Sequence, residues 1–289
     1  MKKRRFFNLL YSIFLLIIFS SPVYPESLEK GAESKTSFKR IISLGPSITE
    51  QLYLLAAEDK LVGCTIYCKR PKEAESKEKV GTAIKVNLEK IVTLKPDLVL
   101  ATSLTSPKVI EKLKALEIKV VSFRTPKSFD EICRQFLNLG ELVGEKRKAE
   151  KIIEGVKKKV YEIKERVEIF SKPKVLVQVG TKPLWVATKD SFINDFIEFA
   201  GGKNIGPAGS GIYSRERVLK QNPDVIIITT MGIVGENEKK LWQRYKPINA
   251  VENNRIYIID SYKLCSPTPV SFVQTLEELV GILHFDLEE

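Results

Sequence analysis

An internal repeat constrains the fold of this chain more than any other feature of its sequence. Residues 87–102 align without a gap on residues 214–229. In each copy a residue suited to cap a helix precedes a short helical pattern, a Pro-Asp pair ends that pattern, and a buried strand follows. The repeat therefore predicts two lobes built on the same plan, with Glu89 and Glu216 at the same place on each lobe.

Short β-branched runs alternate with helical or turn segments throughout both halves of the chain. Continuous apolar strands separated by helices are typical of mostly parallel sheets that are covered on both faces. The expected strands are residues 40–44, 61–66, 97–101 and 119–123, and then residues 174–179, 184–187, 224–229 and 255–260. The fold class that we expect is therefore α/β, with one such sheet in each lobe.

A long helical pattern without proline separates the two halves at residues 128–170. Ser128 and Glu131 have the spacing of a capping box at its start, and Pro173 lies just beyond its end. Within residues 145–170 apolar side chains recur every three or four positions among Lys, Arg and Glu, which predicts a narrow apolar stripe. The pattern fits one or two helices, and its last part alone would be about 39 Å long at ~1.5 Å per residue.

This segment should act as a stiff connector, because a continuous helix resists bending. Gly140 and Gly144 are its expected weak points, and a further amphipathic helix is expected at residues 273–287. The boundaries that we predict are residues 38–127 for the first α/β lobe, 128–172 for the connecting helix and 173–289 for the second lobe.

The first 25 residues have the pattern of a secretory signal peptide. A basic start at residues 2–5 precedes an apolar run at residues 6–19, which is shorter than the ~18 residues of a membrane span. Residues 26–37 are polar and are predicted to form a tether. We therefore expect a protein that is exported to the periplasm or another extracytoplasmic location.

The formal net charge of +11 does not indicate a nucleic-acid partner. Four of the positive charges lie in the predicted signal peptide, and the rest are spread over helical segments without a basic-aromatic motif. We therefore expect neither nucleic acid nor an anionic lipid surface as the partner.

Sequence motifs of the common enzyme classes are absent. The chain has no dinucleotide-binding glycine fingerprint, no phosphate-binding Walker loop, no zinc-protease motif and no serine nucleophile elbow. Its single histidine, His284, lies in the expected C-terminal helix, where a surface or packing role is expected. We predict no catalytic residue, no metal site and no cofactor, although an enzyme acting in the cleft and a non-transport module of the same fold remain alternatives.

Several motifs, in their order along the chain, resemble the cobalamin and ferric-siderophore binding proteins of ABC importers. They are RIISLGPSITE at residues 40–50, LVG at 61–63, YC at 67–68, Pro71, VG at 80–81, NLE at 87–89, KPDLV at 95–99, PLW at 183–185, GGKN at 201–204, SRE at 214–216 and NPD at 222–224. The resemblance covers residue 38 to the C-terminus. It implies two Rossmann-like lobes, a rigid helix between them, and one corrinoid or iron-chelate ligand in the cleft.

The resemblance also implies the partners. Glu89 and Glu216 match the two glutamates that dock onto arginines of a dimeric permease, which works with an ATPase, and the binding protein is expected to be a monomer when free. A simpler explanation exists for each glutamate alone, since a carboxylate in the first turn of a helix complements the helix dipole.

Candidate ligand-binding residues follow the expected strands, because ligands bind beyond the carboxyl ends of strands in open α/β sheets. Ser47 also has a structural explanation, since Ser47 and Glu50 have the spacing of a capping box. The predicted ligand-binding residues are Pro46, Ser47, Tyr67, Cys68, Trp185, Tyr213, Asp260 and Tyr262. Of these, Tyr67 and Trp185 match aromatic cleft positions of cobalamin-binding relatives.

Departures from the family pattern bear on the ligand. Tryptophans of cobalamin binders are replaced by Ala83, Thr102 and Ser210, which weakens the case for intact cobalamin. Family arginines are replaced by Ser266 and Val270, which weakens the case for a strongly anionic chelate.

Four cysteines, Cys64, Cys68, Cys133 and Cys265, have no pairing that the sequence defines. Cys68 and Cys265 would face each other across the cleft or ligate a metal centre on one interpretation. On the other, the cysteines are inert or disulfide-bonded.

Overall fold

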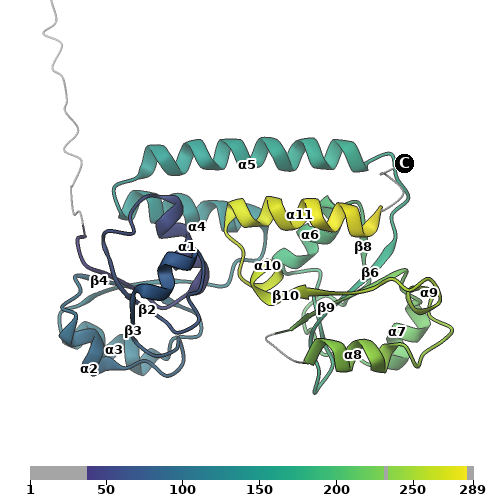
Figure 1. Ribbon diagram of the computed structural model, residues 1–289, viewed down its shortest axis with the longest axis horizontal. Coiled ribbons are helices and arrows are strands. Elements are labelled where there is room, and N and C mark those ends of the chain that lie inside the picture. Colours follow the sequence, from purple (N-terminus) through teal and green to yellow (C-terminus); the bar gives the residue numbers. More distant parts are fainter. Residues whose placement is uncertain (1–37, 231–233, 285–289) are drawn as a thin grey trace, which may run out of the picture. The chain divides into compact units, whose positions relative to one another are not determined.

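The computed structural model describes residues 38–230 and 234–284 of the chain (Figure 1). The predicted signal peptide and tether lie outside these residues, as does the end of the helix expected at residues 273–287. All statements below refer to the described part of the chain.

The first lobe is built on a parallel sheet with the strand order β3-β2-β1-β4-β5. Its strands are β1 (Ile41–Ser43), β2 (Leu61–Cys64), β3 (Glu78–Lys79), β4 (Leu98–Thr102) and β5 (Lys119–Phe123). Its helices are α1 (Pro46–Leu54), the 3-10 helix η1 (Lys72–Ser76), α2 (Leu88–Thr93) and α3 (Pro107–Ala115). The four strands expected from the sequence are confirmed, whereas β3 was not predicted because its two residues are both charged and form no apolar run.

The second lobe is built on a sheet with the order β10-β9-β6-β7, in which β8 pairs with β6. All pairs are parallel except β6 with β7, which confirms the expectation of mostly parallel sheets. The strands are β6 (Lys174–Gly180), β7 (Trp185–Val186), β8 (Lys203–Asn204), β9 (Val225–Thr230) and β10 (Ile256–Asp260). The helices are α6 (Phe192–Phe199), α7 (Arg215–Gln221), α8 (Val234–Trp242), α9 (Asn249–Glu252), α10 (Ser261–Cys265) and α11 (Pro269–Leu283).

The repeat extends to backbone geometry. Asn87 caps α2 and Ser214 caps α7, each by accepting a hydrogen bond from a backbone N–H three residues later. Lys95 and Asn222, which are equivalent in the repeat, have φ values of 47° and 48°. In both copies the residue just before the Pro-Asp pair therefore has a left-handed backbone conformation.

The aspartate of each Pro-Asp pair fastens its lobe's first strand. Asp97 donates its N–H to the Arg40 carbonyl oxygen and accepts the Arg40 N–H on its carboxylate, at 3.0 Å in each case. Asp224 makes the same two contacts with Lys174, both at 2.8 Å. The duplicated motif thus performs the same structural task twice.

The connector consists of two helices, α4 (Phe129–Leu142) and α5 (Lys146–Val167). Ser128 caps α4 by accepting the N–H of Glu131, whereas the Glu131 carboxylate accepts the N–H of Lys127 rather than that of the cap residue. Half of the expected capping box is therefore present. The predicted lobe boundaries at residues 127 and 172 fall between β5 and α4 and between α5 and β6, and they remain a prediction.

The two connector glycines have different roles. Gly144 has a φ of 80° and lies where the chain turns from α4 to α5. Gly140 faces α5, and a methyl group built on it would lie 2.5 Å from Cβ of Ala149. Gly140 is therefore not the weak point that the sequence suggested, because it allows the two helices to pack closely.

One apolar cluster joins the connector to both lobes. It includes Leu52 and Leu100 of the first lobe, Val156 of α5 and Leu276 of α11, all of which are buried. Helices α4, α5 and α11 contact one another, and Figure 1 shows α5 and α11 on one side of the sheets with α2, α3, α7 and α8 on the other. This cluster thus lies along the connector side, and each lobe has a further, smaller apolar cluster of its own.

Candidate ligand-binding site

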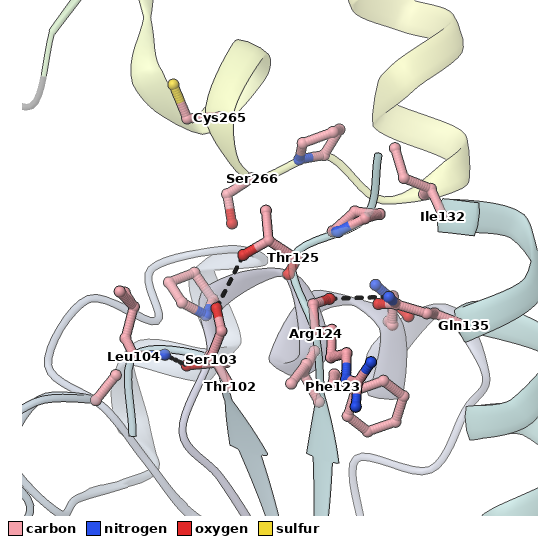
Figure 2. Close-up of a pocket in the computed structure, with 18 of the residues that line it drawn as sticks. Thr102, Ser103, Leu104, Phe123, Arg124, Thr125, Ile132, Gln135, Cys265 and Ser266 are labelled. Carbon is pink, nitrogen blue, oxygen red and sulfur yellow. Dashed lines mark hydrogen bonds between the residues drawn. The ribbon is translucent and has the colours of Figure 1, made fainter. Parts of the chain in front are cut away.

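A cavity of about 230 Å³ lies between the lobes, beyond the carboxyl ends of β1, β4 and β5 (Figure 2). The first lobe contributes the β1–α1 turn and the segments that follow β4 and β5, and Figure 2 shows the Ser266 side chain pointing toward them from the second lobe, next to Cys265. The placement agrees with the rule that ligands of open α/β sheets bind beyond the carboxyl strand ends.

Apolar and hydroxyl side chains dominate the lining. Ser103 and Thr125 share a hydroxyl hydrogen bond of 2.8 Å, and the Gln135 amide donates to the Arg124 carbonyl oxygen at 2.9 Å. Arg124 is the one cationic residue of the lining, and no Asp or Glu belongs to it. The complete lining is Leu44, Gly45, Pro46, Ser47, Ile48, Gln51, Ala83, Thr102, Ser103, Leu104, Phe123, Arg124, Thr125, Pro126, Ile132, Gln135, Phe192, Cys265, Ser266 and Pro267.

Pro46 and Ser47 are the two predicted residues that line this cavity. The capping box proposed for Ser47 and Glu50 is wrong, because Gly45 occupies the cap position and Pro46 is the first residue of α1. Ser47 therefore lies inside the first turn, and Glu50 forms an ion pair elsewhere. In this position Ser47 lines the cavity.

Trp185 and Tyr213 lie on the second lobe outside the cavity lining. Trp185 is 42% exposed in β7, where it pairs with Ile212. Tyr213 is half-buried against the core of the second lobe, and the Arg217 guanidinium lies 5.8 Å from its ring centroid. Their contact with ligand remains a prediction.

Tyr67, Asp260 and Tyr262 lie where segments of the two lobes meet. Asp260 caps α10 by accepting the Tyr262 N–H at 2.6 Å. The Tyr262 hydroxyl donates a short hydrogen bond to the carbonyl oxygen of Tyr67. The Tyr262 side chain thus connects the lobes, and contact of these three residues with ligand is likewise still a prediction.

Arg70 makes the largest set of contacts at this junction. Its Nη2 lies 3.1 Å from the Tyr262 carbonyl oxygen and 3.4 Å from that of Ser266, and 3.0 Å from Oε2 of Glu50. Its Cζ lies 5.0 Å from the centroid of the Tyr262 ring. Burial raises the pKa of Glu50, and the adjacent guanidinium opposes that rise.

The four cysteines are all free. Cys68 is buried, accepts a hydrogen bond at 3.2 Å from the Thr49 hydroxyl and shares another at 3.2 Å with the Thr65 hydroxyl. A hydrogen bond from the Cys64 thiol, with those hydroxyls, lowers the pKa of Cys68 to about 6, and the same contact raises the pKa of Cys64. Cys68 thus belongs to the core of the first lobe, whereas Cys265 is exposed and lines the cavity.

Glu89 and Glu216 are both exposed at the second position of α2 and α7. Hydrogen bonds from its own backbone N–H and from the Ser214 side chain lower the pKa of Glu216. Neither glutamate is buried against its own lobe.

Two arginines near the cavity were missed by the sequence reasoning. Arg124 directly follows β5, so the strand-end rule applied to that strand would have found it. Arg70 lies six residues after β2, and its second-lobe acceptors are about two hundred positions away, so no local pattern indicates its role.

Two kinds of feature are missing from the described residues. None of their helices is long and apolar enough to span a membrane. Within the same part of the chain, no group of three His, Cys, Asp or Glu side chains is placed to hold a metal ion.

Comparison with known proteins gives a consistent result. The model of a family described as periplasmic binding protein matches residues 41–263. The "Uncharacterized ABC transporter substrate-binding lipoprotein YvrC" of Bacillus subtilis is 31% identical over 277 residues, which are 91% of this chain and 87% of that protein.

Two solved structures have the same fold. A possible iron-binding, periplasmic solute-binding protein from Staphylococcus epidermidis matches with a TM-score of 0.76 and 31% identity, over 86% of this chain and 99% of that one. The periplasmic vitamin B12 binding protein BtuF of Vibrio cholerae matches with a TM-score of 0.72 and 26% identity, over 88% of this chain and 99% of that one. The predicted fold class is confirmed, and the matched proteins are binding proteins rather than enzymes.

Proposed function

Because this chain belongs to the periplasmic binding protein family, we propose that it is the extracytoplasmic solute-binding component of an ABC importer. It captures a corrinoid or iron-chelate ligand between its lobes and delivers that ligand to a permease dimer that works with an ATPase. The pattern of residues 1–25 supports export by a signal peptide, and the free protein is a monomer in this proposal.

The observation that carries the proposal is the cavity at the carboxyl strand ends, which residues of both lobes line. Pro46 and Ser47 belong to one wall, and Cys265, Ser266 and Pro267 belong to the other. A site divided between two lobes suits capture and release by lobe movement, without any bond being made or broken.

The ligand class is supported by the relatives and by the lining. One similar structure is named for vitamin B12 and another for iron. Apolar walls with hydroxyl and amide groups and one cation, Arg124, suit a large, mainly apolar ligand that carries polar or anionic groups. Because the cavity of about 230 Å³ is below the ~300–1,000 Å³ of typical small-molecule sites, such a ligand requires the lobes to separate further.

Docking on the permease is assigned to Glu89 and Glu216. Their equivalent positions in the repeat and their exposure support paired contacts with arginines, which bind carboxylates through two parallel hydrogen bonds. The alternative, that each carboxylate only complements its helix dipole, predicts no loss of transport when both are removed.

Ligand binding can be tested on the purified protein with cyanocobalamin, haemin and ferrichrome. A ligand at a hundred times its dissociation constant adds about 2.7 kcal/mol of stability, so the thermal midpoint should rise with the correct compound. Visible absorbance of the bound compound provides an independent measurement. No shift with any of the three would contradict the proposed ligand class.

Docking can be tested with Glu89→Ala combined with Glu216→Ala. Transport by the partner permease and ATPase should be lost, while ligand affinity stays unchanged. Glu111→Ala combined with Glu252→Ala is the matched control, because each lobe again loses one exposed helical glutamate. Equal transport by both double variants would refute the docking role.

A further inference from the structure

The two lobes are held together in different ways on the two sides of the cleft. On the connector side, a continuous apolar cluster runs through α4, α5, α11 and both lobes. On the other side, the segment after β2 meets the segment after β10 through the polar contacts of Arg70 and Tyr262. The contacts of Arg70 and Tyr262 are polar, so water can replace them when the two segments separate.

The polar contacts are reciprocal. Arg70 of the first lobe donates to the carbonyl oxygens of Tyr262 and Ser266 in the second lobe, and Tyr262 donates its hydroxyl to the carbonyl oxygen of Tyr67 in the first. Glu50 pairs with the same Nη2 atom from within the first lobe. We call these five residues the interlobe clasp.

The clasp is adjacent to the ligand cavity. Ser266 accepts a clasp hydrogen bond through its carbonyl oxygen and also lines the cavity beside Cys265 and Pro267. Because Arg70 fixes Ser266, it also determines how far this wall of the cavity stands from the first lobe. The small volume of the cavity is therefore tied to the closed clasp.

The closed clasp carries an internal cost. Arg70 retains 31% of its side-chain exposure and Glu50 17%, so both charges are largely removed from water. Arg70 Nε is buried and makes no hydrogen bond within the described residues. A buried donor without an acceptor destabilises the arrangement that buries it, which lowers the free-energy cost of opening the clasp.

We propose that the interlobe clasp holds the cleft closed, with Arg70 as the positioning residue, and that ligand entry requires the clasp to open. The inference rests on the proposed role of the cavity as the ligand site. It implies that closure of the clasp lowers the apparent affinity for ligand, because only the fraction of molecules whose cleft is open can bind.

Hydrogen exchange of the ligand-free protein tests the clasp directly. Arg70→Met keeps an unbranched apolar stem but removes the guanidinium with its charge and its donors. Exchange should become about tenfold faster in residues 65–71 and 261–268 together, and α5 should be unaffected. Tyr262→Phe, which removes only the hydroxyl, should produce a smaller increase in the same two segments.

Lys90→Met is the matched control. Lys90 forms an ion pair with Glu78 at 2.7 Å within the first lobe, so its loss removes a cation and a charge pair without touching the second lobe. Faster exchange in residues 65–71 alone after Arg70→Met would mean that Arg70 supports only its own loop, and this result would overturn the proposal. Unchanged exchange in both segments would do the same.

Binding kinetics provide a second test that structural damage would not imitate. With cyanocobalamin or haemin, whichever the wild-type protein binds, Arg70→Met should raise the association rate and lower the dissociation constant by the same factor. Weaker binding would overturn the proposal, because it would mean that Arg70 supports the bound state. If neither compound binds the wild-type protein, the proposed ligand class fails, and hydrogen exchange still decides the clasp.

Discussion

Replacing Phe272 with alanine tests whether the connector and the lobes form one cooperative unit. Phe272 is fully buried in α11, where its ring stacks on Phe196 at 3.8 Å between centroids and lies 4.6 Å from Phe129. Truncation of a fully buried phenylalanine costs about 3–5 kcal/mol, of which each lost aromatic pair accounts for ~0.5–1.5 kcal/mol. For a chain of this size the thermal midpoint should fall by roughly 6–20 °C, at ~2–4 °C per kcal/mol.

Urea unfolding, followed by tryptophan fluorescence and by far-UV circular dichroism, provides the measurement. The buried Trp242 reports on the second lobe, whereas circular dichroism reports on the whole chain. Both signals should shift together, because one apolar cluster includes residues of both lobes. Tyr161→Ala on the exposed face of α5 is the control and should change stability by less than about 0.5 kcal/mol. A loss below about 1.5 kcal/mol for Phe272→Ala, or two separate transitions, would refute the reasoning.

Three further predictions concern the two left-handed residues of the repeat, the buried His284 and two exposed apolar side chains. Lys95→Gly should stabilise the protein by about 0.5–1 kcal/mol, because a left-handed backbone costs a non-glycine residue ~1–2 kcal/mol. Asn222→Gly should instead destabilise the protein, because two hydrogen bonds of the Asn222 side chain are lost. Urea midpoints in the opposite order would contradict this prediction. Burial lowers the pKa of His284, so the free energy of unfolding should be highest above the ordinary histidine pKa of about 6.5 and should fall as the pH drops through that value. If a His284→Gln variant keeps the same slope of stability against pH, His284 is not the group responsible. Val92 and Leu219 are 44% and 36% exposed at equivalent positions one turn after Glu89 and Glu216, for which we propose the docking role, so Val92→Ser with Leu219→Ser should weaken capture by the permease complex without changing ligand affinity. Capture equal to that of the wild-type protein would exclude these two side chains from the proposed docking surface.

The duplicated elements were predictable because their patterns are local. A capping residue, a Pro-Asp pair and an apolar run each act within a few residues, so α2 with β4 and α7 with β9 appear where the repeat predicts them. The capping box at Ser47 failed because Pro46 occupies the first helical position and shifts the cap to Gly45. The strands β3 and β8 consist of two polar residues each, so they show no apolar run and depend on the strands beside them.

The candidate site was predictable only in part. The rule about strand ends found Pro46 and Ser47, because the β1–α1 turn lies at the carboxyl edge of the sheet whatever the second lobe does. The partners of Arg70 and Tyr262 depend on how closely the two lobes approach each other, and no property of either segment alone determines that distance.

The contact between Gly140 and Ala149 has a consequence for how the molecule moves. Because there is no room for a side chain between them, α4 and α5 move as one rigid unit. Any movement of one lobe relative to the other must therefore be absorbed where the chain enters and leaves this helix pair, at residues 124–128 and 168–173. A bulkier residue at position 140 would push the two helices apart and disturb both lobes from a position that contacts no ligand.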